Sequence, residues 1–279
     1  MKISLCNEVL RERPFAEQCA LAAALGYDGL EVAPFTLSDD PARIPAAERA
    51  RLKRLAADAG VPVTGLHWLL SAPAGLSITN GGADVVARTR AHILSMVELC
   101  ADLGGTVLVH GSPGQRQLAD APSPEAGRMV AADHFASAGD AAERAGVLYL
   151  VEPLAPSLTD YINTIEEAAR VVESVASPGL ATMLDCAAVA GGECESAAIL
   201  AERWLPSGVL RHIHLNDRAL GGPGQGEDRF MPLLAALARG GYDGIAAIEP
   251  FIYSPDGPTC AARSIGYVRG LIETLGDAS

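Results

Sequence analysis

Short runs rich in Leu and β-branched residues alternate with longer Ala-rich stretches along the whole chain. This alternation is typical of repeated strand–helix units. Eight short runs predict strands, at residues 3–6, 29–32, 63–66, 106–110, 148–152, 181–185, 212–215 and 245–249. Amphipathic helices are predicted between them, at residues 15–25, 46–59, 88–103, 129–145, 165–175 and 230–239. Because eight parallel strands close a barrel, we expect one α/β domain, a (β/α)8 TIM barrel over residues 1–279.

An internal repeat supports the barrel. The sequence Gly-Tyr-Asp-Gly occurs at residues 26–29 and again at 241–244, each time between a predicted helix and a predicted strand. Glycine there supplies the left-handed conformation that ends a helix. The alternative, an open doubly wound sheet, needs a Gly-rich phosphate turn after an early strand, and the chain has no such motif. The Gly-rich stretch 221–227 contains no Lys, and we predict a loop over the barrel mouth.

Composition and charge narrow the classes of function. With 49% hydrophobic and 20% charged residues, the chain resembles an ordinary globular protein. Its net charge of -13 repels phosphate backbones and anionic lipid, so neither nucleic acid nor membrane is an expected partner. No apolar run reaches the ~18 residues of a membrane span, and the chain enters a strand directly after Met1, which predicts a cytoplasmic protein. The six cysteines form no C-x-x-C pair, and most are expected to be small buried apolar residues.

Chemistry-bearing residues gather at the C-terminal ends of the predicted strands, which share one face of a barrel. Strands five to eight end, in order, in Glu152, Asp185, His214 and Glu249. Three carboxylates about 4 Å apart repel one another by ~4 kcal/mol per pair at a dielectric near 20, and a dication removes that penalty. We therefore predict one divalent metal ion bound by these four residues. Their oxygen-rich donor set favours Mn2+ or Mg2+, with Co2+ or Zn2+ as alternatives.

Each of these residues also has a purely structural interpretation. A lone acid at a strand end is more often a helix N-cap or an ion-pair partner, so the metal hypothesis depends on four such ends in succession. Pro153 and Pro250 hold the preceding Glu residues in extended backbone at the barrel rim. His212 points to the same side of its strand as His214, and it either packs lower in the barrel or supports the ligand.

Five further residues are predicted to contact the substrate, namely Glu31, His67, Trp68, His110 and Arg218. Trp68 beside His67 suits stacking on a sugar face, although a Trp that caps the core is equally common. His110 begins a rim loop and is included for its position. Arg218 either contacts a substrate oxygen or is a solvated surface charge. Glu31 either contacts the substrate or forms an ion pair inside the barrel.

At these positions the chain resembles the sugar phosphate isomerase/epimerase family, a group of xylose isomerase-like TIM barrels. The resemblance runs end to end and rests on the segments 26–31, 152–153, 185, 212–217, 223–226 and 241–251. It implies that Glu152, Asp185, His214 and Glu249 are the metal ligands, and that the two Glu residues also carry protons to and from a bound hydroxyketone. It further implies a homo-oligomer, either a dimer or a tetramer.

Similar members of the family include ketose 3-epimerases, hydroxypyruvate isomerases, keto-inositol dehydratases, 3-keto-glycoside epimerases and the repair enzyme endonuclease IV. The chain departs from the ketose 3-epimerase pattern at Ala188, where those enzymes carry His, and at residues 156–158, where they carry a further Glu. The missing His also argues against endonuclease IV, which needs additional His ligands.

We therefore predict that the protein is a metal-dependent isomerase or epimerase of a sugar or keto-sugar, with a role in carbohydrate metabolism. Such an enzyme abstracts a proton next to a carbonyl through a metal-bound enediolate. A lyase or dehydratase of a keto-sugar, keto-inositol or 3-keto-glycoside would use the same site and expel a β-leaving group instead. A catalytically silent metal-binding barrel is the third alternative.

Overall fold

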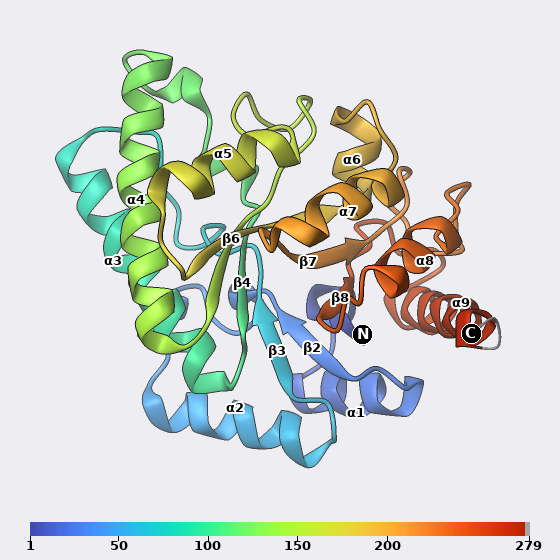
Figure 1. Cartoon of the computed structure of the whole chain (residues 1–279). Helices are drawn as coiled ribbons and strands as arrows, with labels where there is room; N and C mark the ends of the chain where they lie inside the picture. Colours follow the sequence, from blue (N-terminus) through green and yellow to red (C-terminus); the bar gives the residue numbers. More distant parts are fainter. Residues whose placement is uncertain (277–279) are drawn as a thin grey trace.

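The computed structural model describes residues 1–276, and their strands close into a barrel (Figure 1). Every strand pairs in parallel with its sequence neighbours, and β8 returns to β1. The strands are β1 (Lys2–Cys6), β2 (Gly29–Val32), β3 (Val63–Leu66), β4 (Val107–His110), β5 (Leu148–Val151), β6 (Leu180–Asp185), β7 (Leu210–Leu215) and β8 (Ile245–Ile248). The predicted α/β barrel is thus confirmed.

Helices surround the strands (Figure 1). They are α1 (Phe15–Leu25), α2 (Ala46–Asp58), α3 (Ala83–Leu103), α4 (Pro124–Ala145), α5 (Ile165–Val175), α6 (Cys186–Gly192), α7 (Ala197–Trp204), α8 (Met231–Arg239) and α9 (Gly257–Gly276). Helix α4 starts five residues before its predicted start, because the Ser123 side chain caps the Ala126 N–H and Pro124 occupies the first helical position. Capping, rather than the apolar stripe, decides where this helix begins.

The repeated Gly-Tyr-Asp-Gly segments have the predicted backbone conformation. Gly26 ends α1 with φ 87°, and its N–H donates to the carbonyls of Ala22 and Ala23. Gly241 has φ 66° and follows α8. A residue with a Cβ is strained in this region, so glycine lets the chain leave each helix and enter the next strand within a few residues.

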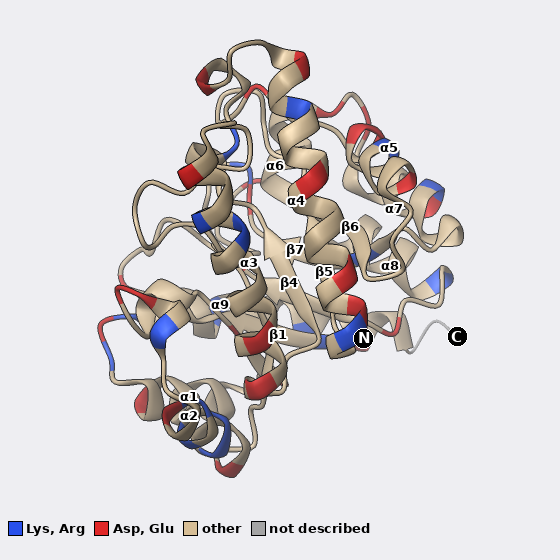
Figure 2. Ribbon diagram, turned by 90° about the vertical axis from the view of Figure 1, so that its left-hand side faces the viewer, with Lys and Arg blue, Asp and Glu red and all other residues tan. Residues whose placement is uncertain are grey.

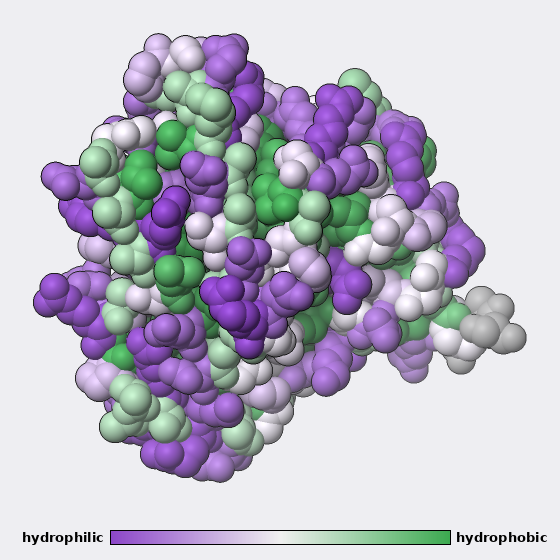
Figure 3. Space-filling view, turned by 60° about the vertical axis from the view of Figure 1, so that its left-hand side comes forward, coloured by the Kyte–Doolittle hydropathy of each residue, from purple (hydrophilic) through white to green (hydrophobic). Residues whose placement is uncertain are grey.

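Apolar side chains fill the barrel and the layer between strands and helices. Leu5, Leu30, Leu66, Leu184 and Ile213 are fully buried there. Charged residues lie mainly on the outer helices and loops (Figure 2). The face in Figure 3 mixes hydrophilic side chains with smaller apolar areas. Among the described residues, no helix combines the length and the apolar composition needed to cross a bilayer.

The barrel brings the C-terminal ends of all its strands to one end of the molecule. In the strand register Cys6 of β1 lies beside Glu31 of β2, and Asp185 of β6 lies beside His214 of β7. Glu249 follows β8, and its N–H donates to the Leu215 carbonyl of β7. Polar residues far apart in the sequence are therefore neighbours at this end.

Candidate active site

Four side chains from successive strand ends converge there. Their ligand atoms all lie within 4.8 Å of one another, and all four residues are buried. This set, called the floor cluster below, comprises Glu152, Asp185, His214 and Glu249. The structure thus brings together the four residues that the strand-end pattern predicted as metal ligands.

His214 is oriented from both sides of its ring. Its Nε2 lies 2.8 Å from Oε1 of Glu31, while Nδ1 lies 2.8 Å from Oε2 of Glu249 and 3.9 Å from Oε1 of Glu152. A proton on Nε2, donated to Glu31, leaves the Nδ1 lone pair facing the floor cluster, as a metal-ligating histidine requires. Burial by itself lowers the pKa of His214. The charges and hydrogen bonds of Glu249 and Glu31 have a larger effect, and together they raise the pKa of His214 well above its usual value.

Glu31 does not occupy the position expected of a substrate contact. Its side chain is fully buried, and its second carboxylate oxygen lies 2.8 Å from Nε2 of His212. Burial opposes its ionisation, but His212 and His214 prevail and hold the pKa of Glu31 well below its usual value. The position of Glu31 therefore agrees with the alternative that it forms an ion pair inside the barrel. It lies behind His214 and exposes no surface to a substrate.

Asp185 is held by two hydrogen bonds. Its Oδ1 accepts from the Ala188 N–H at 2.7 Å, which caps α6, and its Oδ2 accepts from the Asn216 amide at 2.6 Å. Burial raises the pKa of Asp185, while His214 and these hydrogen bonds act in the opposite direction. Asp185 thus caps a helix and also belongs to the floor cluster, so the two interpretations are compatible.

Glu152 is supported by an arginine that the sequence did not single out. The buried guanidinium of Arg116 donates to the main-chain carbonyl of Glu152 at 2.6 Å and to that of Ile162 at 3.3 Å. Burial, followed by the charge of Glu249, raises the pKa of Glu152 well above its usual value. No strand-end pattern predicts Arg116, because it lies in a loop and contacts the site only in the folded chain.

A cavity of about 230 Å3 opens above the floor cluster. It is lined by His67, Trp68, Gly111, Pro113, Glu152, Leu154, Leu158, Leu220, Glu249 and Phe251. Trp68 and Phe251 meet edge to face across it, with ring centroids 6.3 Å apart. Trp68 and Leu220 both have positive φ, 53° and 65°. Non-glycine residues in this strained region concentrate at functional sites.

Of the five residues predicted to contact the substrate, some line the cavity and others do not. His67 and Trp68 line the cavity. His110 is fully buried, with Nδ1 2.7 Å from the Tyr149 hydroxyl, and does not reach the cavity. Arg218 is largely exposed outside the cavity and pairs with Asp228 at 2.5 Å. The positions of His110 and Arg218 do not suit contact with a substrate in this cavity. The His110 ring is enclosed by protein, and the Arg218 side chain is paired with Asp228 outside the cavity.

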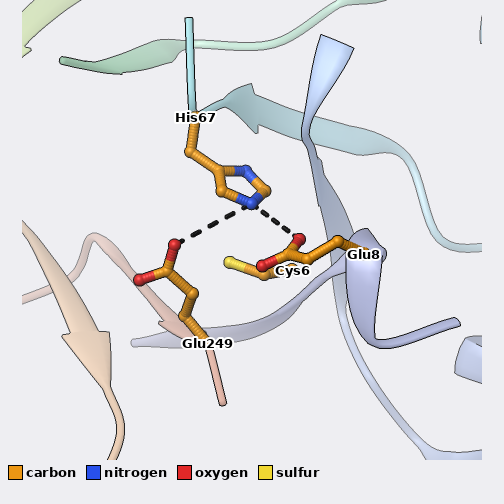
Figure 4. Close-up of side chains that lie close together, drawn as sticks. All are labelled: Cys6, Glu8, His67 and Glu249. Atoms are coloured by element: carbon orange, nitrogen blue, oxygen red, sulfur yellow. Dashed lines mark hydrogen bonds and ion pairs between the residues drawn. The ribbon is translucent and has the colours of Figure 1, made fainter. Parts of the chain in front are cut away.

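A second group of ligand atoms lies beside the floor cluster (Figure 4). This set, called the thiol cluster below, comprises Cys6, Glu8, His67 and Glu249, all buried and with ligand atoms within 4.8 Å of one another. Nε2 of His67 lies 2.7 Å from Oε2 of Glu8 and 3.9 Å from Oε1 of Glu249. Cys6 is buried, as expected of most cysteines here, but it lies among potential ligands.

The floor cluster fits a divalent cation. Its three carboxylates are enclosed, and burial raises the pKa of each. Charged carboxylates at this spacing are costly unless a cation lies among them. Three oxygen donors and one imidazole nitrogen are a donor set that hard or borderline dications accept.

Comparisons with known proteins identify relatives along almost the whole chain. The sequence model of the family described as "Xylose isomerase-like TIM barrel" matches residues 19–271. A Streptomyces coelicolor protein named "Putative hydroxypyruvate isomerase" is 28% identical over 267 residues, which cover 91% of this chain and 90% of that protein.

Solved structures of sugar epimerases share the fold. A D-psicose 3-epimerase superposes with a TM-score of 0.81 at 18% identity, covering 97% of this chain and 99% of the other. A 3-keto-D-glucoside 4-epimerase from E. coli gives 0.82 at 20% identity, covering 97% and 99%. An L-ribulose 3-epimerase gives 0.83 at 19% identity, covering 99% and 96%.

Proposed function

Because the chain belongs to the xylose isomerase-like TIM barrel family, we propose that it is a divalent-metal-dependent isomerase or epimerase of a sugar or keto-sugar. The names of its relatives, a hydroxypyruvate isomerase and several sugar 3- and 4-epimerases, support this class. These reactions share one requirement, the removal and return of a proton next to a carbonyl.

The floor cluster at the base of an enclosed cavity is the observation that carries the proposal. Glu152, Asp185, His214 and Glu249 would hold the metal, for which Mn2+ or Mg2+ suits the oxygen-rich donors. A dication bound there would supply Lewis-acid chemistry toward the substrate carbonyl.

The two Glu residues differ from the other two members of the floor cluster. Glu152 and Glu249 line the cavity, whereas Asp185 and His214 do not. Only the two Glu carboxylates are therefore placed to exchange a proton with a substrate, and we assign them that role. Burial raises the pKa of both, which brings a carboxylate closer to the basicity that proton abstraction requires.

The cavity lining favours an uncharged substrate. Apart from the two Glu carboxylates and His67 it is formed by apolar residues, and neither Lys nor Arg is among its lining residues. A phosphorylated sugar or a free carboxylate would find no Lys or Arg partner in this lining and would lie close to the Glu carboxylates. A neutral keto-sugar that stacks on Trp68 suits this lining better than hydroxypyruvate does.

Hydrogen exchange tests the proposal directly. The metal-loaded protein is incubated in D2O with keto-sugars, keto-inositols, 3-keto-glycosides and hydroxypyruvate, and NMR records deuterium next to the carbonyl. We expect incorporation with a neutral substrate, and its loss in Glu249→Gln but not in Glu173→Gln, a surface control on α5. Elimination of a hydroxyl in place of proton return would identify a lyase. No incorporation with any compound would contradict the proposal and favour a silent barrel.

A further inference from the structure

We propose that the barrel mouth binds a second divalent cation in the thiol cluster, next to the metal of the floor cluster. The ligands would be the Cys6 thiolate, Glu8, His67 and Glu249, and the donor set selects a zinc-like ion. The inference goes beyond the proposed reaction, and it concerns what the site binds rather than which substrate is converted.

The four ligands come from three separate parts of the barrel. Cys6 ends β1, and Glu8 lies in the short 3-10 helix Asn7–Leu10 that follows it. His67 follows β3 and Glu249 follows β8. Figure 4 shows the side chains converging on one another, with the His67 ring facing the Glu8 and Glu249 carboxylates and the Cys6 sulfur close to them. His67 and Glu249 also line the cavity, which gives a cation a route from solvent.

Glu249 belongs to both clusters, and its two oxygens face different partners. Oε2 lies 2.8 Å from Nδ1 of His214, while Oε1 lies 3.9 Å from Nε2 of His67. A carboxylate with one oxygen in each ligand set is the usual bridge of a two-metal site. With both cations bound, the two oxygens of Glu249 would be coordinated, and Glu152 would then be the one of the two Glu residues left to exchange the proton.

Glu8 has an oxygen that the protein leaves without a partner. The residue is 5% exposed, and Oε1 is buried and accepts no hydrogen bond. A buried carboxylate oxygen without a donor carries a desolvation penalty that folded proteins rarely leave uncompensated. A cation coordinated beside Cys6 would satisfy this oxygen.

Charge balance gives an independent argument. Five carboxylates at most 5% exposed surround the two clusters: Glu8, Glu31, Glu152, Asp185 and Glu249. The buried Arg116 guanidinium is a cation whose charge acts on Glu152. With the histidines neutral, Arg116 and one dication offset three of the five carboxylate charges. A second dication offsets the other two, and the Cys6 thiolate that it binds leaves one negative charge. One metal ion therefore leaves a buried excess of negative charge.

The donor atoms determine the class of ion. The floor cluster offers three carboxylates and one imidazole, which suit Mn2+ or Mg2+. The thiol cluster adds a sulfur ligand, and sulfur with imidazole and carboxylate is a set that Zn2+ and Co2+ prefer in four-coordinate geometry. The two clusters would thus differ in the metal that they select.

Metal titration of the stripped protein tests the inference without any measurement of turnover. Calorimetry with Zn2+ is expected to give two equivalents per chain for the wild type and one for Cys6→Ser and for the isosteric Glu8→Gln. Asp185→Asn should weaken the floor cluster and leave the thiol cluster able to bind. Cys194→Ser, at an exposed cysteine, is the matched control and should keep two equivalents.

Co2+ reports on the sulfur ligand itself. The wild type loaded with Co2+ should show a thiolate-to-cobalt charge-transfer band in the near ultraviolet, absent from Cys6→Ser and retained in Cys194→Ser. A single equivalent in the wild type, or a spectrum unchanged by Cys6→Ser, would overturn the inference. Circular dichroism checks that each variant is folded. Because only binding is measured, failure of the inference leaves the exchange experiment unaffected, and failure of the exchange experiment leaves the inference standing.

Discussion

The carboxylate of Glu152 lies directly against Gly111, where an added Cβ would overlap its Oε2 atom. Gly111 follows β4 and also lines the cavity. The absence of a side chain at this position therefore leaves the space in which the Glu152 carboxylate reaches the floor cluster.

Gly111→Ala should inactivate the protein without unfolding it. The new methyl group displaces Glu152, and a misplacement of about 1 Å at a reacting group costs on the order of 100-fold in rate. The exchange rate in D2O is the measurement. Gly114→Ala is the matched control, because a Cβ there meets nothing within 4 Å and activity should be unchanged. Equal rates in the two variants would contradict the proposed role of Glu152.

Glu31→Gln should weaken metal binding although Glu31 is not a proposed ligand. The amide loses the charge that pairs with His212 and His214, so the His214 ring is less firmly oriented. Loss of such a supporting carboxylate typically costs about 10- to 100-fold in metal affinity. Calorimetry with Mn2+ measures this change. Unaltered affinity would show that Glu31 serves the barrel core and not the metal.

Trp68→Ala should raise KM more than it lowers kcat. Trp68 lines the cavity together with Phe251. In our proposal it contacts a part of the substrate that takes no part in the proton transfer. Loss of one aromatic contact is worth ~0.5–1.5 kcal/mol, which corresponds to an increase in KM of up to about tenfold. The apolar but exposed Met129, which does not line the cavity, provides the control Met129→Ala. A drop in kcat alone would refute the stacking role.

Metal removal should make thermal stability depend on pH. Burial raises the folded-state pKa of Glu152, Asp185 and Glu249, so the folded protein without metal retains protons that the unfolded chain releases. Their contribution to stability is complete below the ordinary carboxyl pKa and is lost as the pH rises through the raised values. Melting temperature with chelator should therefore fall as the pH rises above the ordinary carboxyl range. Added Mn2+ should flatten this dependence, and identical curves would argue against a metal site.

Much of the fold was predictable because it depends on local pattern. The alternation of short and long apolar segments indicated eight strands, and the structure shows eight. Strands five to eight end in acidic or imidazole side chains, and their convergence was predictable from the rule that the C-terminal ends of barrel strands share one face. Helix starts were less predictable, since at α4 the Ser123 cap overrides the apolar stripe.

Within the candidate site, the sequence could not predict contacts that depend on how the strands pair in the closed barrel. Glu31 had two interpretations in the sequence, and only the barrel geometry places it behind His214. Arg116 was not singled out, because no strand-end pattern includes a loop residue that reaches back to Glu152. Cys6 was not distinguished from the other cysteines, most of which were expected to be buried apolar residues, because nothing near it in sequence shows that His67 and Glu249 lie close by.

The sequence by itself predicted the barrel and the four residues of the floor cluster, because strand periodicity and the polarity of strand ends are properties of short segments. Only the tertiary structure decided which polar residues face the cavity, which lie behind the floor cluster, and which, like Arg218, lie outside the cavity. Those distinctions arise from closing the barrel, which brings β1 beside β8 and so places Cys6 and Glu8 next to Glu249. Contacts between residues more than two hundred positions apart leave no local pattern from which they could be predicted.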